Sequence, residues 1–386
     1  MIRGHQKNVC LIVIIIMLCS ALMVGCSGGT EKSNKALTGK EVSLSYTSAF
    51  KIVDYGDNFT LLTDAEGNQF LLVPEGTETP EISEAAGATV VNTPLKKVVY
   101  CSTTQVGLLQ AIFTDQEWDS IAAVTTDTAD WYVDAVKTRM ESGAIQYVGT
   151  GGMADPDYEK IQALNPDMVF VYTGDYGLQK TLAKMKELKI PCAVVNDYTE
   201  ATDLGRLEWL KFLGAFYNKG QEAAVFIEAK AAMLDEIAAA VKDKPSPKVV
   251  YGMIYDGKVY IPDGGSYVAK QIKEAGGDYV FAEVNPDKAS SSQVTVEEFY
   301  AKGKDADVFI YSSMVAYMPS LESLLKTEPL LKDFQSVKNG KVYCFAPWYY
   351  MSINKTIEGV KDMASFFHEG LYPDWELVMF QQMPEK

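Results

Sequence analysis

From residue 95 onwards the chain alternates short apolar segments with helical patterns, and this alternation limits the possible folds more than any other feature. Between residues 96 and 217, five apolar segments are each followed by a stretch with hydrophobic residues at three- to four-residue spacing. Strands that alternate with helices pair in parallel, because each helix crosses the sheet between one strand and the next. The sequence therefore predicts an α/β fold with a largely parallel sheet and helices on both faces.

A single long helical pattern separates this series from a second one. Residues 221–242 contain no glycine or proline and carry one apolar stripe. A continuous helix there would be roughly 33 Å long, at about 1.5 Å per residue. A second βα series follows and begins with a hairpin signal at Asp256-Gly257. We expect an N-terminal α/β lobe over 95–218, a bridging helix over 219–242 and a C-terminal α/β lobe over 243–386.

Three parts precede the lobes. Residues 1–25 combine a basic start with an apolar run shorter than the roughly 20 residues of a membrane-spanning helix, which is typical of a signal peptide. The run ends in LMVGC at Cys26, which resembles the lipobox of bacterial lipoproteins and implies lipidation of Cys26; an uncleaved anchor is the alternative. Residues 26–41 are expected to form a flexible tether, and short β-rich runs over 42–94 predict a small β extension.

Charge and residue usage exclude several classes of function. The net charge is −16, and removal of residues 1–25 leaves 33 basic against 51 acidic residues, a charge of −18. An acidic surface repels phosphates, so no nucleic-acid partner is expected. His368 alone remains after the signal, which excludes histidine-based zinc sites; we expect no metal site, no cofactor and no catalytic residue. Cys101, Cys192 and Cys344 lie in apolar runs and are expected to be buried free thiols.

Three segments carry a resemblance to a known family. Residues 157–172 (DYEKIQALNPDMVFVY) and 294–312 (VTVEEFYAKGKDADVFIYS) occupy corresponding places in the two series, and 337–352 (VKNGKVYCFAPWYYMS) hold the last strand and its loop. Their order, together with the lipobox and the long helix, resembles the substrate-binding lipoproteins of ABC importers for iron-siderophores, haem and cobalamin. The resemblance implies two lobes bridged by one helix, the type III arrangement, whereas the 42–94 extension lies outside the family pattern.

The candidate ligand-binding residues follow from the strand order. In a two-lobed binder the ligand lies outside the carboxyl ends of the parallel strands, where loops leave the sheet. The residues at these places are Thr103, Thr104, Trp131, Tyr132, Gly152, Met153, Tyr172, Tyr267, Ser292, Gln293, Tyr317, Trp348, Tyr349 and Tyr350. The last three follow Pro347, which discourages strand pairing, so a loop is expected there with Trp348 as a ligand platform. Phe345, inside the strand, is expected in the core.

Two glutamates hold matching positions in the two lobe motifs. Glu159 and Glu297 each begin a helical pattern just after a strand-to-loop passage. In the family that the chain resembles, one acidic residue on the rim of each lobe meets arginines of the transporter, so the resemblance implies that Glu159 and Glu297 dock the ABC permease. The alternative is that both are helix N-terminal charges favoured by the helix dipole.

These observations favour a substrate-binding protein over two other classes. An enzyme on the same scaffold lacks a candidate base with a partner, and a surface adhesion protein leaves the lobe motifs unexplained. The expected partners are a small-molecule metal chelate and the permease–ATPase complex of an ABC importer. We expect a monomer, held by lipid on Cys26 at the extracytoplasmic face of the cell membrane.

Arginine content narrows the ligand. Proteins that hold polyanionic siderophores usually use arginine forks, but only Arg139 and Arg206 remain after the signal, and both fall in helical patterns. A bulky chelate of low net charge is therefore expected, with cobalamin or a related corrinoid first and a neutral ferric hydroxamate next. Haem held through a tyrosine stays open, and a haem-binding or metal-chelatase-like surface lipoprotein is the alternative function.

Overall fold

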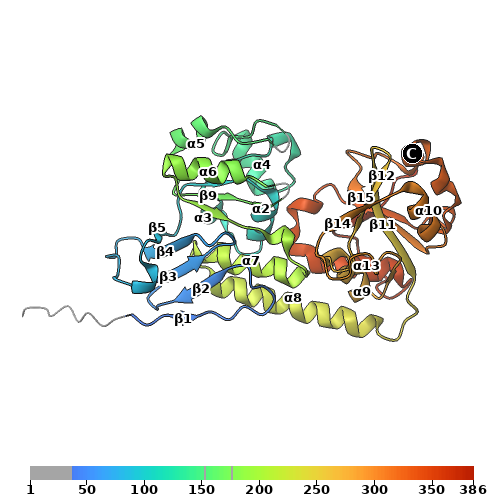
Figure 1. Cartoon of the computed structure of the whole chain (residues 1–386), viewed down its shortest axis with the longest axis horizontal. Coiled ribbons are helices and arrows are strands. Elements are labelled where there is room, and N and C mark those ends of the chain that lie inside the picture. The colour runs from blue at the N-terminus through green and yellow to red at the C-terminus, as the bar shows by residue number, and fades with distance from the viewer. Residues whose placement is uncertain (1–36, 152–153, 175–176) are drawn as a thin grey trace, which may run out of the picture. The chain divides into compact units, whose positions relative to one another are not determined.

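Three β-sheets and the helices around them make up the described part of the computed structural model, residues 37–151, 154–174 and 177–386 (Figure 1). Thr38–Lys386 form one compact unit. The predictions for the signal peptide, Cys26 and most of the tether lie outside the described residues. None of the helices in the described ranges combines the length and hydropathy that crossing a bilayer requires.

The predicted β extension is a five-stranded sheet in the order β1-β2-β3-β4-β5. Its strands are β1 (Lys40–Glu41), β2 (Lys51–Asp54), β3 (Thr60–Thr63), β4 (Gln69–Pro74) and β5 (Thr89–Thr93). The sheet packs on α7 (Asp203–Ala215), where the ring of Phe50 lies 4.6 Å from Trp209 and that of Phe70 lies 6.0 Å from Phe216. The extension therefore shares one hydrophobic core with the first lobe.

The first lobe contains a five-stranded sheet in the order β10-β9-β6-β7-β8, and every pair in it is parallel, as predicted. Its strands are β6 (Val98–Tyr100), β7 (Ile121–Val124), β8 (Gln146–Tyr147), β9 (Met168–Val171) and β10 (Cys192–Val194). Its helices are α2 (Thr103–Leu109), α3 (Asp115–Trp118), α4 (Asp134–Glu141), α5 (Tyr158–Leu164), α6 (Gln179–Leu188) and α7. Val98 and Val99 enter different apolar clusters, because successive side chains point to opposite faces of the sheet, and both faces are covered.

A single helix, α8 (Gly220–Val241), follows the first lobe (Figure 1). Its 22 residues agree with the predicted helix over 221–242 to within one residue at each end. It contacts α7 of the first lobe and α13 (Thr356–Phe367) of the second. The bridging helix is therefore packed against both lobes.

The second lobe contains a sheet in the order β14-β12-β11-β15-β16-β17, with β13 beside β11. Its strands are β11 (Lys248–Tyr255), β12 (Lys258–Pro262), β13 (Asp278–Tyr279), β14 (Ser291–Val294), β15 (Val308–Met314), β16 (Val342–Phe345) and β17 (Phe380–Gln382). Its helices are α9 (Tyr267–Glu274), α10 (Val296–Gly303), α11 (Leu321–Thr327), α12 (Gln335–Lys338) and α13. The predicted hairpin is confirmed: β11 and β12 are antiparallel, and Asp256 and Gly257 have φ of 51° and 70°.

Short 3-10 turns complete the described chain: η1 (Ser83–Ala85), η2 (Thr128–Asp130), η3 (Asp197–Thr199), η4 (Pro329–Asp333), η5 (Tyr349–Met351) and η6 (Ile353–Lys355). β13 ends at Tyr279, where the chain turns: the N–H of Ala282 donates to the carbonyl of Tyr279, and that of Gly264 donates to the carbonyl of Val284. Cys101, Cys192 and Cys344 are free and buried, as predicted, and burial raises the pKa of Cys101 to about 12.

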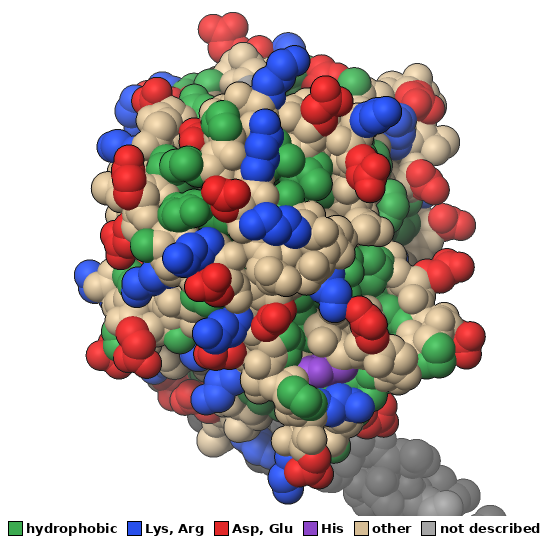
Figure 2. All heavy atoms as spheres, turned by 90° about the vertical axis from the view of Figure 1, so that its right-hand side faces the viewer, with side chains coloured by type: hydrophobic (Ala, Val, Ile, Leu, Met, Phe, Trp, Pro, Cys, Tyr) green, Lys and Arg blue, Asp and Glu red, His purple; other side chains and the backbone are tan. Residues whose placement is uncertain are grey.

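Acidic and basic side chains are mixed on the face of the second lobe seen in Figure 2, and neither charge forms a continuous patch there. Nucleic acids bind to surfaces where lysine and arginine gather on one side. This face lacks that arrangement.

Candidate functional site

The carboxyl ends of the first-lobe strands carry a connected set of polar side chains. Ser102 caps α2, and its hydroxyl accepts a hydrogen bond from the N–H of Thr104. Thr103 and Thr104 are half-buried in the first turn of α2, and the Thr104 hydroxyl donates to Asp197 over 2.9 Å. Asp197 begins the turn that follows β10. The hydrogen bond therefore joins the loops that leave two strands of one sheet.

A buried guanidinium lies next to Asp197. Arg206, on α7, is 3% exposed; its Nη2 lies 3.5 Å from Asp197 Oδ2, and its Cζ lies 4.4 Å from the ring centroid of Tyr267. Tyr267 begins α9 in the second lobe. Burial of Asp203, one turn earlier on α7, raises the pKa of its carboxyl to about 6, although the charge of Arg206 opposes this shift. The polar side chains therefore extend from the first lobe to the second.

Asp203 itself binds two helices of the second lobe. Its Oδ1 accepts a hydrogen bond from Gln271 on α9 over 2.8 Å and another from the hydroxyl of Thr356, the first residue of α13. Both donors and the acceptor are buried. Hydrogen bonds between buried partners resist rearrangement, because a lost partner leaves an unsatisfied polar group. This contact fixes the start of α7 to the second lobe.

We call the contact of α2 with η5 and η6 the lobe junction. Gln110 donates its side-chain N–H to the carbonyl of Met351 over 2.6 Å, and the backbone N–H of Tyr132 lies 3.3 Å from the Met351 sulfur. Gly107 makes the approach possible, since a Cβ there would lie 2.9 Å from the Met351 oxygen. Residues 349–355, which follow the last parallel strand, are thus packed directly on the first lobe.

The segment CFAPWYYM at 344–351 divides its aromatic rings between the core and the surface. Phe345 is buried in β16, as predicted, and stacks on the buried ring of Tyr349 at 3.8 Å. β16 ends at Phe345, and the chain turns after Pro347. Trp348 and Tyr350 are exposed to 40% and 44%. The structure therefore presents two of the four rings to solvent.

Trp348 faces the opposite lobe. Its ring lies 6.4 Å from the ring of Tyr132 in an edge-to-face arrangement, and Tyr132 is 51% exposed. The indole N–H of Trp348 donates to the carbonyl of Val378 over 2.7 Å, which fixes the ring plane. Edge-to-face pairs of this kind are favourable contacts. Tyr132 and Trp348 therefore form a two-lobe aromatic pair with exposed ring surface.

Two predicted ligand contacts are enclosed in the core. Trp131 is 1% exposed and donates its indole N–H to the carbonyl of Thr126, and Tyr349 is 3% exposed beneath Phe345. A side chain without accessible surface cannot contact a ligand in this structure. We therefore do not keep Trp131 and Tyr349 among the proposed ligand contacts.

The remaining predicted contacts occupy different places. Tyr172 is half-buried, with its ring 6.1 Å from Tyr198, and Tyr317 is 76% exposed after β15. Ser292 and Gln293 lie on β14, where the Ser292 hydroxyl donates to Asp263, so this hydroxyl already has a partner. Gly152 and Met153 lie outside the described residues.

Glu159 and Glu297 hold equivalent positions at helix starts. Glu159 lies in the first turn of α5, which Asp157 caps by accepting from the N–H of Lys160. Glu297 lies in the first turn of α10, which Thr295 caps by accepting from the N–H of Glu298. Both glutamates are exposed. Their surroundings suit a docking residue and a helix-end charge equally well.

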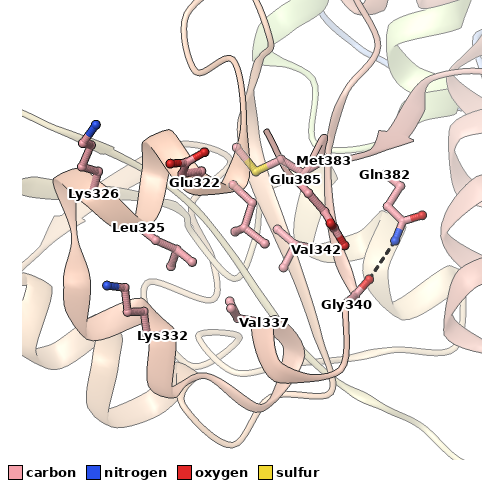
Figure 3. Close-up of a pocket in the computed structure, with 11 residues that line it drawn as sticks. Glu322, Leu325, Lys326, Lys332, Val337, Gly340, Val342, Gln382, Met383 and Glu385 are labelled. Carbon is pink, nitrogen blue, oxygen red and sulfur yellow. Dashed lines mark hydrogen bonds between the residues drawn. The ribbon is translucent and has the colours of Figure 1, made fainter.

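A pocket of about 450 Å³ lies at the other end of β16 from Trp348 (Figure 3). Leu325, Val337 and Val342 form its apolar part, and Lys326, Lys332 and Glu322 surround it. Val342 is the first residue of β16, whereas the aromatic pair follows the carboxyl end of the same strand. The pocket is therefore separate from the candidate site.

Sequence reasoning missed the polar residues between the lobes, Asp203, Arg206 and Gln271. One signal was present: α7 carries apolar residues on all sides, as in LGRLEWLKFLGAF, so the charged residues among them had to be buried. A buried charge needs a partner, which the sequence does not identify.

Known proteins of related sequence and fold identify the family of this chain. The family model described as periplasmic binding protein matches residues 98–347. The chain belongs to the periplasmic binding protein family. Members of this family are the substrate-binding components of ABC importers and act outside the cytoplasm. The predicted resemblance is thereby confirmed, as is the fold class of two α/β lobes with a bridging helix.

Two relatives of this periplasmic binding protein come from Methanocaldococcus jannaschii, and both are named uncharacterized lipoproteins. One is 30% identical over 94% of this chain and 93% of its own length; the other is 26% identical over 89% and 88%. Among solved structures, a periplasmic heme-binding protein from Pseudomonas aeruginosa has a TM-score of 0.57 and 17% identity; the match covers 76% of this chain and 99% of that protein's chain. The vitamin B12-binding protein of Vibrio cholerae has a TM-score of 0.51 and 16% identity, covering 71% and 97%. At these identities the two structures support the fold.

Proposed function

We propose that this chain captures a bulky metal chelate of low net charge between its lobes and delivers it to an ABC permease. The observation that carries the proposal is the aromatic pair of Tyr132 and Trp348, which brings exposed ring surface from both lobes to one place. Exposed aromatic rings bind apolar macrocycles and chelates by burial and ring contact. Tyr350 and Tyr317 add exposed rings at the carboxyl ends of the second-lobe strands.

Low ligand charge is supported by the partners of the two arginines. Arg139 binds Asp119 over 2.9 Å on the surface of the first lobe. Arg206 is buried between Asp197 and the Tyr267 ring. A guanidinium that already has a carboxylate partner is a poor fork for a polyanionic siderophore. Cobalamin, a related corrinoid or a neutral ferric hydroxamate fits this lining better than a citrate or catecholate complex.

Haem is the second candidate, favoured by the exposed tyrosines that could bind its iron. Coordination through a tyrosine requires the phenolate form, because the charged oxygen is the ligand for ferric iron. Tyr132, Tyr317 and Tyr350 have exposed rings and are therefore the residues to test for a haem ligand.

A ligand panel tests the proposal. The detergent-solubilised full chain is incubated separately with cyanocobalamin, a neutral ferric trihydroxamate, haem and ferric citrate, then desalted and measured by absorbance and thermal unfolding. We expect retained colour and a raised Tm with cyanocobalamin or the hydroxamate, since ligand at 100 times its Kd adds about 2.7 kcal/mol of stability. Retention of ferric citrate alone would refute the low-charge argument. Retention of no chelate would refute the ligand class.

Docking to the permease is proposed for Glu159 and Glu297, one exposed glutamate at a helix start of each lobe. Membrane attachment is proposed through lipid on Cys26, in keeping with the name lipoprotein carried by the two relatives. In a lipidating host, Cys26→Ser should move the protein from the membrane fraction to the soluble fraction. Identical fractionation of both forms would contradict the lipid anchor.

A further inference from the structure

The β extension reaches the edge of the first-lobe sheet through the turn between β3 and β4. Asp64 is 3% exposed and organises this turn by accepting from the N–H groups of Glu66 and Asn68, at 2.9 and 2.8 Å. Its second oxygen accepts from the N–H of Val194 over 2.8 Å. Because β10 is the edge strand of its sheet, the N–H of Val194 points away from β9. Asp64 thus accepts the hydrogen bond of an N–H group that has no partner within the sheet.

Glu66, in the same turn, holds the loop that follows β9. Its Oε1 accepts from the hydroxyl of Thr173 over 2.6 Å. Thr173 is 2% exposed, follows Tyr172 and lies two residues after the end of β9. A hydrogen bond to a charged acceptor is stronger than one between neutral groups. The turn of the extension therefore contacts two neighbouring strands at their carboxyl ends.

Thr173 also has partners on the loop after β10. Its N–H donates to the side-chain oxygen of Asn196 over 2.8 Å, its hydroxyl accepts from the Asn196 amide over 2.9 Å, and its carbonyl accepts from the Tyr198 hydroxyl. The next residue, Asp197, accepts from Thr104. Hydrogen bonds therefore join Glu66 to Thr173 and Asn196, and the adjacent Asp197 continues the series to Thr104 of the candidate site.

Sequence coverage also connects the extension with the rest of the chain. The family model begins at residue 98, so the extension lies outside the matched segment. The relative that covers 94% of this chain leaves too few unmatched residues to omit the whole of 42–94. The relative therefore has at least part of the extension, and in this chain the extension contacts the rim loop of the binding lobe.

We propose that the extension is part of the ligand site, because Glu66 and Asp64 hold the rim loop of Tyr172 and Thr173 in the position that the ligand meets. Glu66 is a positioning residue that acts through Thr173. This inference rests on the proposed function, since it requires that the ligand binds at the carboxyl ends of these strands.

The test compares Glu66→Ala and Thr173→Val in the full chain by titration with cyanocobalamin, or with the panel chelate that binds. Loss of this hydrogen bond should weaken binding about fivefold to tenfold in each variant. The double variant should be no weaker than Thr173→Val alone, because Thr173→Val already removes the contact with Glu66, together with the hydrogen bond from Asn196. Thr173→Ser keeps the hydroxyl and should bind as the parent protein does.

Two controls separate positioning from general damage. Glu75→Ala removes another carboxylate of the extension, one that binds the exposed Lys96, and should leave affinity unchanged. Hydrogen exchange at the amides of Thr173 and Val194, measured without ligand, should be faster in Glu66→Ala at an unchanged Tm. Additive losses in the double variant would overturn the inference.

The failure of the inference differs from the failure of the proposed function. If Glu66→Ala and Thr173→Val bind normally while Trp348→Ala binds weakly, the extension has no part in the site and the proposed function stands. If no panel chelate binds, both proposals are refuted.

Discussion

Replacement of Trp348 by alanine tests the candidate site most directly. The side chain is 40% exposed, and a tryptophan side chain can bury up to about 250 Å², so a ligand could cover about 100 Å² of it. At about 25 cal/mol per Å², full coverage contributes about 2.5 kcal/mol, and partial coverage about 1 kcal/mol. Trp348→Ala should therefore weaken ligand binding by roughly fivefold to seventyfold.

Thermal unfolding provides the control for this variant. Without ligand, Trp348→Ala removes one hydrogen bond, to Val378, and one exposed ring contact, which together lower the free energy of unfolding by about 1–2 kcal/mol. Phe345→Ala instead removes a buried ring that stacks on Tyr349 and should cost about 3–5 kcal/mol of stability. The affinity is measured by titration with the chelate that binds in the panel. Unfolding of Trp348→Ala with normal affinity in the folded fraction would refute the ligand-platform role.

Three further predictions concern the lobe junction, pH and docking. Gly107→Ala should lower the Tm and the affinity, because the added Cβ would lie 2.9 Å from the backbone oxygen of Met351. Gly220→Ala, which has open space around it, should change neither quantity, and equal Tm values for the two variants would contradict the close approach. Burial, and next the charge of a buried aspartate, raises the pKa of Glu274 to about 7, above its ordinary 4.5. The stability that Glu274 contributes is therefore complete below about pH 4.5 and is lost as the pH rises through 7. In urea unfolding, the free energy of unfolding should differ less between pH 5 and pH 8 in Glu274→Gln than in the parent protein. Lysine at both Glu159 and Glu297 should abolish uptake and leave chelate affinity unchanged, because rim charges act on partner encounter; normal uptake would refute docking.

The elements that local pattern determines were predicted well. α8 follows from a run of residues without glycine or proline, and the β11–β12 hairpin follows from Asp256-Gly257, whose positive φ values suit the turn. Phe345 was assigned correctly to the core, and the loop expected after Pro347 leaves Trp348 exposed, because strand position and the proline between them are local signals. In each case the decisive information lay within a few residues.

Contacts between distant segments were not predictable in the same way. The position of Trp131 at a loop gave no sign that its indole turns inward to the carbonyl of Thr126. The partners of Asp203 lie on α9 and α13, and the sequence does not encode which helix approaches which. β17 escaped prediction because its pairing with β16 depends on a chain segment that returns from α13. These features depend on tertiary packing, which overrides local propensity.

The core shared by the extension and α7 has a consequence for the order in which the chain folds. The carboxylate of Glu208 accepts hydrogen bonds from the backbone of Ser45, Tyr46 and Thr47, across a sequence separation of 163 residues at the widest. During synthesis the extension is made before α7, the helix that covers its apolar face. Contacts of such long range form slowly and leave apolar surface open in the meantime. The extension therefore cannot complete its packing before α7 is made, and its apolar face stays open to aggregation and proteolysis in that interval.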